Sequence, residues 1–339
     1  DAMGDETMHH RTKEFEAIFE ESRKYLFDLF KTDEVVMLSS SGTGAMEASV
    51  VNLCHHTLLN INSGKFGERF GKIAVAHGLG QVEIKNEWDT PVSVDAVVAE
   101  IKNNPEIDAV AIQISESAGG LRHPVEEIAK AVKEIDENIM VIADGITAVG
   151  VESIDVTNID ALLAGSQKAL MLPPGLAIIG LSSRAIEKIG NGKGYYLNLA
   201  SEIKKQKQNT TAYTAATTLT IGLLEILKMI ENRGGLEALY EKTTIRAKAV
   251  KEALKSIGLH IYPKTPAKSM TTIDDADANE IRKILKDDFG VNVAGGQDHL
   301  KGKIFRINQM GLIEDYEMAW VVNSVELALD KLGRRSYDG

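Results

Sequence analysis

Residues 141–174 read VIADGITAVGVESIDVTNIDALLAGSQKALMLPP, and this stretch decides the fold class. The stretch and the two residues before it contain two short apolar runs, Ile139–Ala143 and Ala161–Ala164, which are typical of buried strands. Asp144 directly follows the first run, and Lys168 follows the second. Ligands of open α/β sheets bind at the carboxyl ends of the strands. The stretch therefore predicts a carboxylate and an amine that face one crevice.

Taken singly, each of these two residues has a simpler explanation. Asp144 is well placed to cap a helix or turn, and most lysines are solvated surface charges. A third feature joins them, because residues 39–44, SSSGTG, follow the first predicted strand and open a helix whose N–H groups can face an anion. Such a loop is also an ordinary strand-to-helix turn. Together the three predict a bound phosphate, a protonated ring nitrogen beside Asp144 and an imine on Lys168.

Apolar runs alternate with amphipathic segments on both sides of this stretch, which favours a mainly parallel sheet covered by helices on both faces. Further buried strands are expected at Val35–Leu38, Ile73–Ala76, Ala109–Ile114 and Leu176–Leu181. Helices are expected between them at Ala45–Leu59, Val94–Lys102 and Glu126–Ile135.

The pattern changes after about Ala215, where helices predominate. Helices are expected at Leu219–Glu231, Leu236–Ile257, Asn279–Asp288 and Asp315–Leu332, and strands at Ser269–Ile273 and Lys303–Ile307. We place a boundary at the Gly234-Gly235 break, which gives a large domain of residues 1–233 and a small α+β domain of residues 234–339. Residues 1–12 are polar, and from them we expect that an N-terminal piece precedes the sequence.

Composition excludes several kinds of partner. The 339 residues carry 38 basic and 49 acidic side chains, a net charge of −11, and a cluster of positive charge that would bind nucleic acid is not seen. No apolar run has the length of a membrane helix, and the start does not resemble a signal peptide, so we expect a cytoplasmic protein. Cys54 is the single cysteine, which excludes an internal disulfide, and the two His-His pairs lack the spacing of a metal site.

The stretch quoted above resembles the cofactor-lysine region of class V aminotransferases, which are pyridoxal 5′-phosphate (PLP) enzymes of fold type I. The resemblance rests on the pattern Asp…Ser-Gln-Lys-Ala-Leu…Pro-Pro-Gly within residues 144–175 and extends from residues 10–15, HRTKEF, to the last predicted helix. It is strongest for the alanine–glyoxylate, serine–glyoxylate and serine–pyruvate group, which includes proteins once called soluble hydrogenase small subunits. It implies an α/β fold with a mainly parallel seven-stranded sheet between helices and a smaller α+β C-terminal domain.

The resemblance implies PLP as the cofactor and assigns catalytic roles to Lys168, as its aldimine partner and proton carrier, and to Asp144, at the ring nitrogen. Phe66 stands where the family stacks an aromatic ring on the cofactor, often Trp. Ser117 stands where the family hydrogen-bonds the cofactor, and Thr211 where some members have Tyr. The resemblance places other residues near the cofactor phosphate: Gly42, Thr43, Gly44, Gln167 and Thr214.

Arg306 lies in an otherwise apolar run, Lys303–Ile307. A guanidinium there can hold a carboxylate through two parallel hydrogen bonds, whereas the bland explanation is a charge that protects an edge strand. The resemblance implies the first role, with Arg306 gripping the substrate carboxylate. It also implies a homodimer with the active site at the subunit interface, because Thr214 matches a residue that reaches the phosphate of the neighbouring subunit.

The activity implied by the resemblance is a ping-pong transamination. A small amino acid, alanine or serine, would give its amino group to a small 2-oxo acid, glyoxylate or pyruvate. Two alternatives stay open, another fold type I activity such as a lyase or desulfurase, and a non-catalytic subunit that retains the fold. Cys54 lies in an apolar helical stretch, where a core role is favoured over the mobile nucleophile of a desulfurase.

Overall fold

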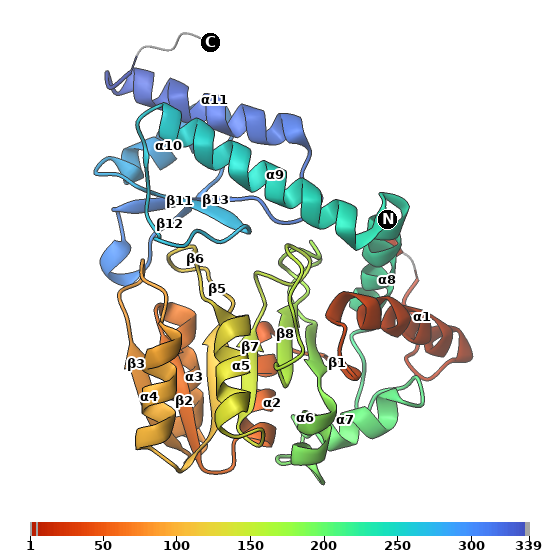
Figure 1. Cartoon of the computed structure of the whole chain (residues 1–339). Coiled ribbons are helices and arrows are strands. Elements are labelled where there is room, and N and C mark those ends of the chain that lie inside the picture. Colours follow the sequence, from red (N-terminus) through yellow and green to blue (C-terminus); the bar gives the residue numbers. More distant parts are fainter. Residues whose placement is uncertain (1, 5, 336–339) are drawn as a thin grey trace.

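The computed structural model describes residues 2–4 and 6–335, which form two main β-sheets flanked by helices and a short two-stranded sheet (Figure 1). The larger sheet has seven strands in the order β1-β9-β8-β7-β4-β2-β3. Its strands are parallel except β9, which runs antiparallel to both β1 and β8. The bounds are β1 (Glu34–Leu38), β2 (Thr57–Asn62), β3 (Gly80–Lys85), β4 (Ile107–Gln113), β7 (Met140–Asp144), β8 (Ala161–Gly165) and β9 (Ala177–Leu181). The expected mainly parallel, seven-stranded α/β sheet is confirmed.

Helices cover both faces of this sheet, and alternate residues of the same strand enter two separate cores. In β7, for example, Val141 and Ala143 belong to one core, and Met140 and Ile142 belong to the other. The first core is completed by α1 (Lys13–Phe30), α4 (Val94–Asn103), α5 (Val125–Ile135) and α8 (Thr217–Asn232). The second is completed by α2 (Gly42–Leu53), α3 (Lys65–Ala76), α6 (Ser183–Ile189) and α7 (Leu199–Gln206).

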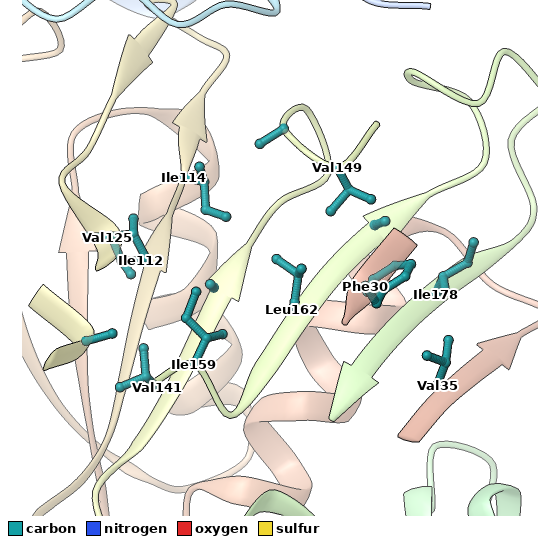
Figure 2. Packing of buried hydrophobic residues seen from close by; sticks show 14 of the residues in the cluster. Phe30, Val35, Ile112, Ile114, Val125, Val141, Val149, Ile159, Leu162 and Ile178 are labelled. Carbon is teal, nitrogen blue, oxygen red and sulfur yellow. The ribbon is translucent and has the colours of Figure 1, made fainter. Parts of the chain in front are cut away.

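Figure 2 shows the first core from close by. Side chains from neighbouring strands, such as Val141, Leu162 and Ile178, belong to this one core, and Phe30 of α1 lies between Leu162 and Ile178 in this view. Both faces of the sheet are therefore covered mainly by apolar side chains, as is usual for parallel strands.

Two predicted elements are wrong. Ile73–Ala76, expected as a strand, is the last turn of α3, where Ile73 and Ala74 are buried and Val75 is exposed. A short apolar run fits a buried helix turn as well as a strand. The helix expected over Ala45–Leu59 ends at Leu53, and its last residues belong to β2.

Asp108 explains why α2 ends early. Its carboxylate accepts the backbone N–H groups of His55 (2.9 Å), His56 (3.0 Å) and Thr57 (3.2 Å), which turns the chain into β2. Cys54 lies in the same turn, fully buried, and burial raises the pKa of its thiol to about 12. Its expected place in the core is confirmed, and its thiol is poorly suited to act as a nucleophile.

The smaller sheet lies across one end of the large one and has the order β10-β11-β13-β12, with all neighbours antiparallel (Figure 1). Three helices share its apolar core. The elements are α9 (Gly235–Ser256), β10 (His260–Ile261), β11 (Met270–Asp274), α10 (Ala278–Phe289), β12 (Ala294–Gly295), β13 (Ile304–Asn308) and α11 (Asp315–Lys331). The predicted boundary at Gly234-Gly235 falls between α8 and α9, and the extent of the two domains stays a prediction.

A hairpin of β5 (Ser115–Glu116) and β6 (Leu121–Arg122) leaves the end of β4 towards the smaller sheet. Short 3₁₀ helices occur as η1 (Ala2–Gly4) and η2 (Asp298–Leu300). Of the polar opening segment singled out in the sequence, Asp1 and Asp5 lie outside the described residues. Within the described part of the chain, the helices lack the length or the apolar character needed to cross a membrane.

Candidate active site

The carboxyl ends of the parallel strands β1, β2, β4, β7 and β8 meet at one edge of the large sheet. The segments that leave them surround a cavity of about 120 Å³. It is lined by Ser41, Gly42, Thr43, Phe66, Arg69, Ser115, Ser117, Asp144, Ile146, Thr147, Gln167 and Lys168. We call it the inner cavity. Asp144 and Lys168 line it together, as the sequence predicts.

A second cavity of about 350 Å³, here called the outer cavity, adjoins it. The two share four lining residues, Phe66, Ser117, Gln167 and Lys168. The rest of its lining comes from the small sheet and the segments next to it: Met270, Ala294, Gln297, Arg306, Asn308 and Met310. Lys168 thus stands between a compartment built by the large sheet and one that includes Arg306.

Asp144 is the last residue of β7 and is almost fully buried. One carboxylate oxygen, Oδ1, accepts the N–H of Ile146 at 2.9 Å. Burial raises the pKa of Asp144 to about 6, against that hydrogen bond and the nearby positive charges of Arg69 and Lys168. The carboxylate is therefore able to hold a cation in the inner cavity.

Lys168 follows β8 in a turn in which Met171 adopts the left-handed backbone conformation, with φ of 52°. Burial lowers the pKa of the Lys168 ammonium, the charge of Arg306 lowers it further, and Asp144 acts in the opposite direction. A lysine with a lowered pKa has more of its amine neutral, and the neutral amine is the nucleophile and base.

The N-terminus of α2 faces the inner cavity through Ser41, Gly42 and Thr43. Within the described residues, the Ser41 side chain makes no capping hydrogen bond, whereas the N-cap side chains of α1, α4, α6 and α7 do. A β-carbon on Gly42 would lie 2.5 Å from Ile146 Cδ1, so a bulkier residue would have to displace the Ile146 side chain. The first N–H groups of α2 are free of a side-chain cap and suit an anion.

Arg69 joins this helix end to Phe66 and was missed in the sequence. Its Nη1 donates to Thr43 Oγ1 at 2.7 Å, and its guanidinium carbon lies 4.9 Å from the centre of the Phe66 ring. A signal was present, because positions 66 and 69 lie three apart on a helix and share a face. The expected strand at Ile73–Ala76 concealed that helix.

Arg306 projects from β13 into the outer cavity, and its guanidinium is held by backbone carbonyls. Gly295 O accepts from both Nε (3.2 Å) and Nη2 (2.7 Å), and Ser117 O accepts from Nη1. The two Gly295 contacts occupy the side edge of the guanidinium, and the Ser117 contact uses one N–H of Nη1, which leaves one N–H each on Nη1 and Nη2. That pair can hold a carboxylate.

Three predicted site residues lie outside both cavity linings. Gly44 is buried inside α2, Thr211 Oγ1 donates to the carbonyl of Tyr213, and Thr214 is exposed, with its carbonyl accepting from Ser39 Oγ at 3.3 Å. Ser41 belongs to the loop of residues 39–44 that the sequence singles out. The other lining residues carry no distinctive motif and were not predicted: Ser115, Ile146, Thr147, Met270, Ala294, Gln297, Asn308 and Met310.

Gln167 lies beside Lys168 and lines both cavities. Its buried Oε1 has no hydrogen-bond partner among the described residues. A buried acceptor without a partner is costly, and a donor inside the cavity would satisfy it. The uncapped helix end and this amide therefore both suit a polar ligand.

Replacing Asp144 by Asn removes a carboxyl group whose pKa is raised from 3.8 to about 6. Between these values the folded chain binds more protons than the unfolded chain, so the free energy of unfolding of the wild type falls as the pH rises. Above about pH 6 this loss of stability is complete and stays constant. For protein freed of bound small molecules, Asp144→Asn is expected to raise the free energy of unfolding at neutral pH by about 1–3 kcal/mol. Urea unfolding at several pH values measures this, and equal pH dependence in the two proteins would contradict it.

Known proteins share this architecture. A family model described as aminotransferase class-V matches residues 1–310. An uncharacterized aminotransferase of Helicobacter pylori is 52% identical over 98% of this chain and 90% of its own length, and a serine–glyoxylate aminotransferase of Hyphomicrobium methylovorum is 28% identical over 93% and 81%. An aspartate aminotransferase of subgroup IV from Thermus thermophilus superposes with a TM-score of 0.91 at 31% identity, covering 97% of this chain and 94% of that one. The chain therefore belongs to the class V aminotransferase family and is a PLP-dependent aminotransferase of fold type I.

Proposed function

We propose that this aminotransferase moves an amino group from a small neutral amino acid, alanine or serine, to glyoxylate or pyruvate. The observation that carries the proposal is the charge of the outer cavity. Among the described residues that line it, Lys168 and Arg306 are the charged ones, and the rest are uncharged. One cation beyond the catalytic lysine suits one carboxylate. The named activity of the Hyphomicrobium relative, serine–glyoxylate transamination, supports the same donor class.

The features of the inner cavity fit PLP. The uncapped N-terminus of α2, with Gly42 and Thr43, would hold the phosphate, together with Gln167. Asp144 would hold the protonated ring nitrogen, and that cation would offset the burial that raises the pKa of its carboxyl. Phe66 would stack on the ring, and Ser117, which also lines the cavity, would form a hydrogen bond to the cofactor. When bound, PLP supplies an electron-withdrawing ring that stabilises negative charge at the substrate Cα.

Lys168 would move the proton. Its pKa is lowered by burial and by Arg306, so its Nζ is able to take a proton from the substrate Cα and return one. Its position between the two cavities puts the amine within reach of both ligands. Donor and acceptor would use this one site in turn, which is a ping-pong scheme.

Arg306 would orient the substrate. Its side edge is fixed on Gly295 O, so the remaining N–H pair is held in a defined direction before the substrate arrives. A guanidinium that is already ordered loses less entropy when it binds a carboxylate. The substrate side chain would then lie near Met270 and Met310, which accept small apolar groups.

We also propose that the enzyme is a homodimer whose active site lies at the subunit interface. Tyr195 is 82% exposed and Tyr196 46% exposed, and both rings contact Tyr213. The hydroxyl of Tyr196 donates to Ser39 O at 3.0 Å, at the start of the loop that leads to α2. An exposed aromatic cluster beside the predicted phosphate loop is typical of a protein interface, and Thr214 is exposed next to it.

Lys168→Ala is expected to abolish the covalent link between cofactor and protein. After borohydride reduction, mass spectrometry of the wild type should find the cofactor mass on the peptide that contains residue 168. The variant should carry no such modified peptide and should lose at least about a thousandfold in activity, because it lacks the nucleophile and the base. Cofactor found on another lysine of the wild type would contradict the assignment.

Arg306→Lys is expected to raise the KM for alanine and serine by about ten- to a hundredfold, because lysine cannot form two parallel bonds to a carboxylate. Steady-state assays with alanine, serine and aspartate as donors, and glyoxylate or pyruvate as acceptors, measure this. Aspartate should be the poorest donor, since its second carboxylate finds no further lining cation. A kcat/KM for aspartate above those of alanine and serine would refute the proposed donor class.

Tyr195→Asp is expected to convert a dimer into a monomer by placing a charge in an apolar contact, and to weaken PLP retention at the same time. Sedimentation velocity gives the oligomeric state, and absorbance gives the bound cofactor. Tyr316→Asp is the matched control, because Tyr316 is also exposed but lies on α11. A monomeric wild type with full activity would refute the dimer.

A further inference from the structure

Glu116 is a fully buried acid at the end of β5 that the proposed function does not use. Its carboxylate accepts three backbone N–H groups. Oε2 receives those of Phe66 (3.0 Å) and Gly67 (2.9 Å), and Oε1 receives that of Ala118 (3.0 Å). Charge-assisted hydrogen bonds of this kind are stronger than neutral ones. The carboxylate therefore fixes two backbone segments, one at residues 66 and 67 and one at residue 118.

The first segment is the N-terminus of α3. Its N-cap residue is Gly64, which has no side chain to cap the helix, and Glu116 supplies the acceptor from a distant part of the chain. A carboxylate is favoured at this positive end of a helix. A β-carbon on Gly64 would lie 2.4 Å from the Glu116 carboxyl carbon, so the glycine leaves the space that the carboxylate fills. Glu116 thereby fixes the backbone that presents the Phe66 ring.

The second segment is the peptide unit between Ser117 and Ala118. Its N–H donates to Glu116 Oε1, and its C=O accepts from Arg306 Nη1. The carboxylate, the peptide and the guanidinium thus form one chain of hydrogen bonds, in which each bond polarises the next. The negative charge of Glu116 also favours the charged form of Arg306.

We propose that Glu116 is a positioning residue that orients Arg306 through the Ser117–Ala118 peptide and holds the Phe66 ring through the N-terminus of α3. The inference rests on the proposed roles of Arg306 and Phe66. It adds that the affinity of Arg306 for the substrate carboxylate depends on a buried anion, Glu116, that contacts neither the substrate nor the cofactor.

The charge of Glu116 comes at a cost to stability. Burial raises the pKa of its carboxyl to about 7, the charge of Asp144 on β7 adds to this, and the three N–H bonds oppose it. Arg306 on β13 is the facing cation. Below about pH 7 the carboxyl gains a proton and its bonds to the N–H groups weaken. Carboxylate binding by Arg306 should therefore decline as the pH falls through about 7.

Glu116→Gln tests this in the holoenzyme. Gln keeps the shape but turns an NH₂ group toward a backbone N–H, so one acceptor is lost. Inhibition by propionate, an unreactive carboxylate, is expected to weaken about tenfold, with a larger rise in the donor KM than fall in kcat and with the pH dependence of inhibition near pH 7 removed. Hydrogen exchange at residues 66, 67 and 118 should quicken about tenfold. Glu152→Gln, at another buried acid bound to Arg122, should leave all of these unchanged.

The Arg306→Lys variant distinguishes a failure of the proposed role of Glu116 from a failure of the proposed role of Arg306. If it weakens propionate inhibition while Glu116→Gln leaves the inhibition and its pH profile unaltered, the role of Glu116 is overturned and the proposed function stands. If Arg306→Lys leaves propionate inhibition intact, the proposed role of Arg306 falls, and this inference with it. Should Glu116→Gln fail to fold, Gly64→Ala displaces the carboxylate while keeping its charge, and normal propionate inhibition in that variant would overturn the proposal.

Discussion

Both faces of the seven-stranded sheet are covered by helices, so its strands have room for functional polar side chains chiefly at their ends. Because six of the seven strands run in the same direction, their carboxyl ends lie at one edge, and the segments that follow five of them converge at the inner cavity. Asp144 and Lys168 occupy this edge for that reason. The small sheet then covers it and brings Arg306 to the outer cavity. The chemistry of the site thus follows from the burial of the sheet.

The site holds two buried acids and two partly buried bases, and burial shifts the pKa values of the two kinds of group in opposite directions. Burial raises the pKa of Asp144 and of Glu116 and lowers the pKa of Lys168 and of Arg306. Each shift moves the group towards its neutral form, so keeping the four groups charged has an electrostatic cost. A phosphate, a ring cation and a substrate carboxylate would each relieve part of that cost. Binding of such charged ligands would therefore stabilise the folded protein.

The two wrongly predicted elements have a common physical cause. Ile73–Ala76 and the pair Leu58-Leu59, at the end of the helix predicted at Ala45–Leu59, are short apolar runs that fit a helix or a strand, and periodicity over so few residues does not separate the two. The conformation of both segments is decided by residues that lie far away in the sequence. Asp108 on β4 ends α2 by binding three backbone N–H groups, and Glu116 on β5 begins α3. In both cases a carboxylate from elsewhere in the chain supplies the cap that the local sequence lacks. The start of α3 was therefore not predicted, and neither was the role of Arg69, which lies one turn into that helix.

The sequence by itself determined the α/β class, the strand-end positions of Asp144 and Lys168, and the family resemblance, because strands and the residues that follow them are set by local pattern. It also singled out Arg306, as a guanidinium in an apolar strand. Only the tertiary structure decided that Arg306 shares a cavity with Lys168, that Phe66 carries Arg69 beside it, and that Glu116 links α3 to the Ser117–Ala118 peptide. These contacts join segments far apart in the chain, and their existence depends on how two sheets pack, which no local pattern encodes.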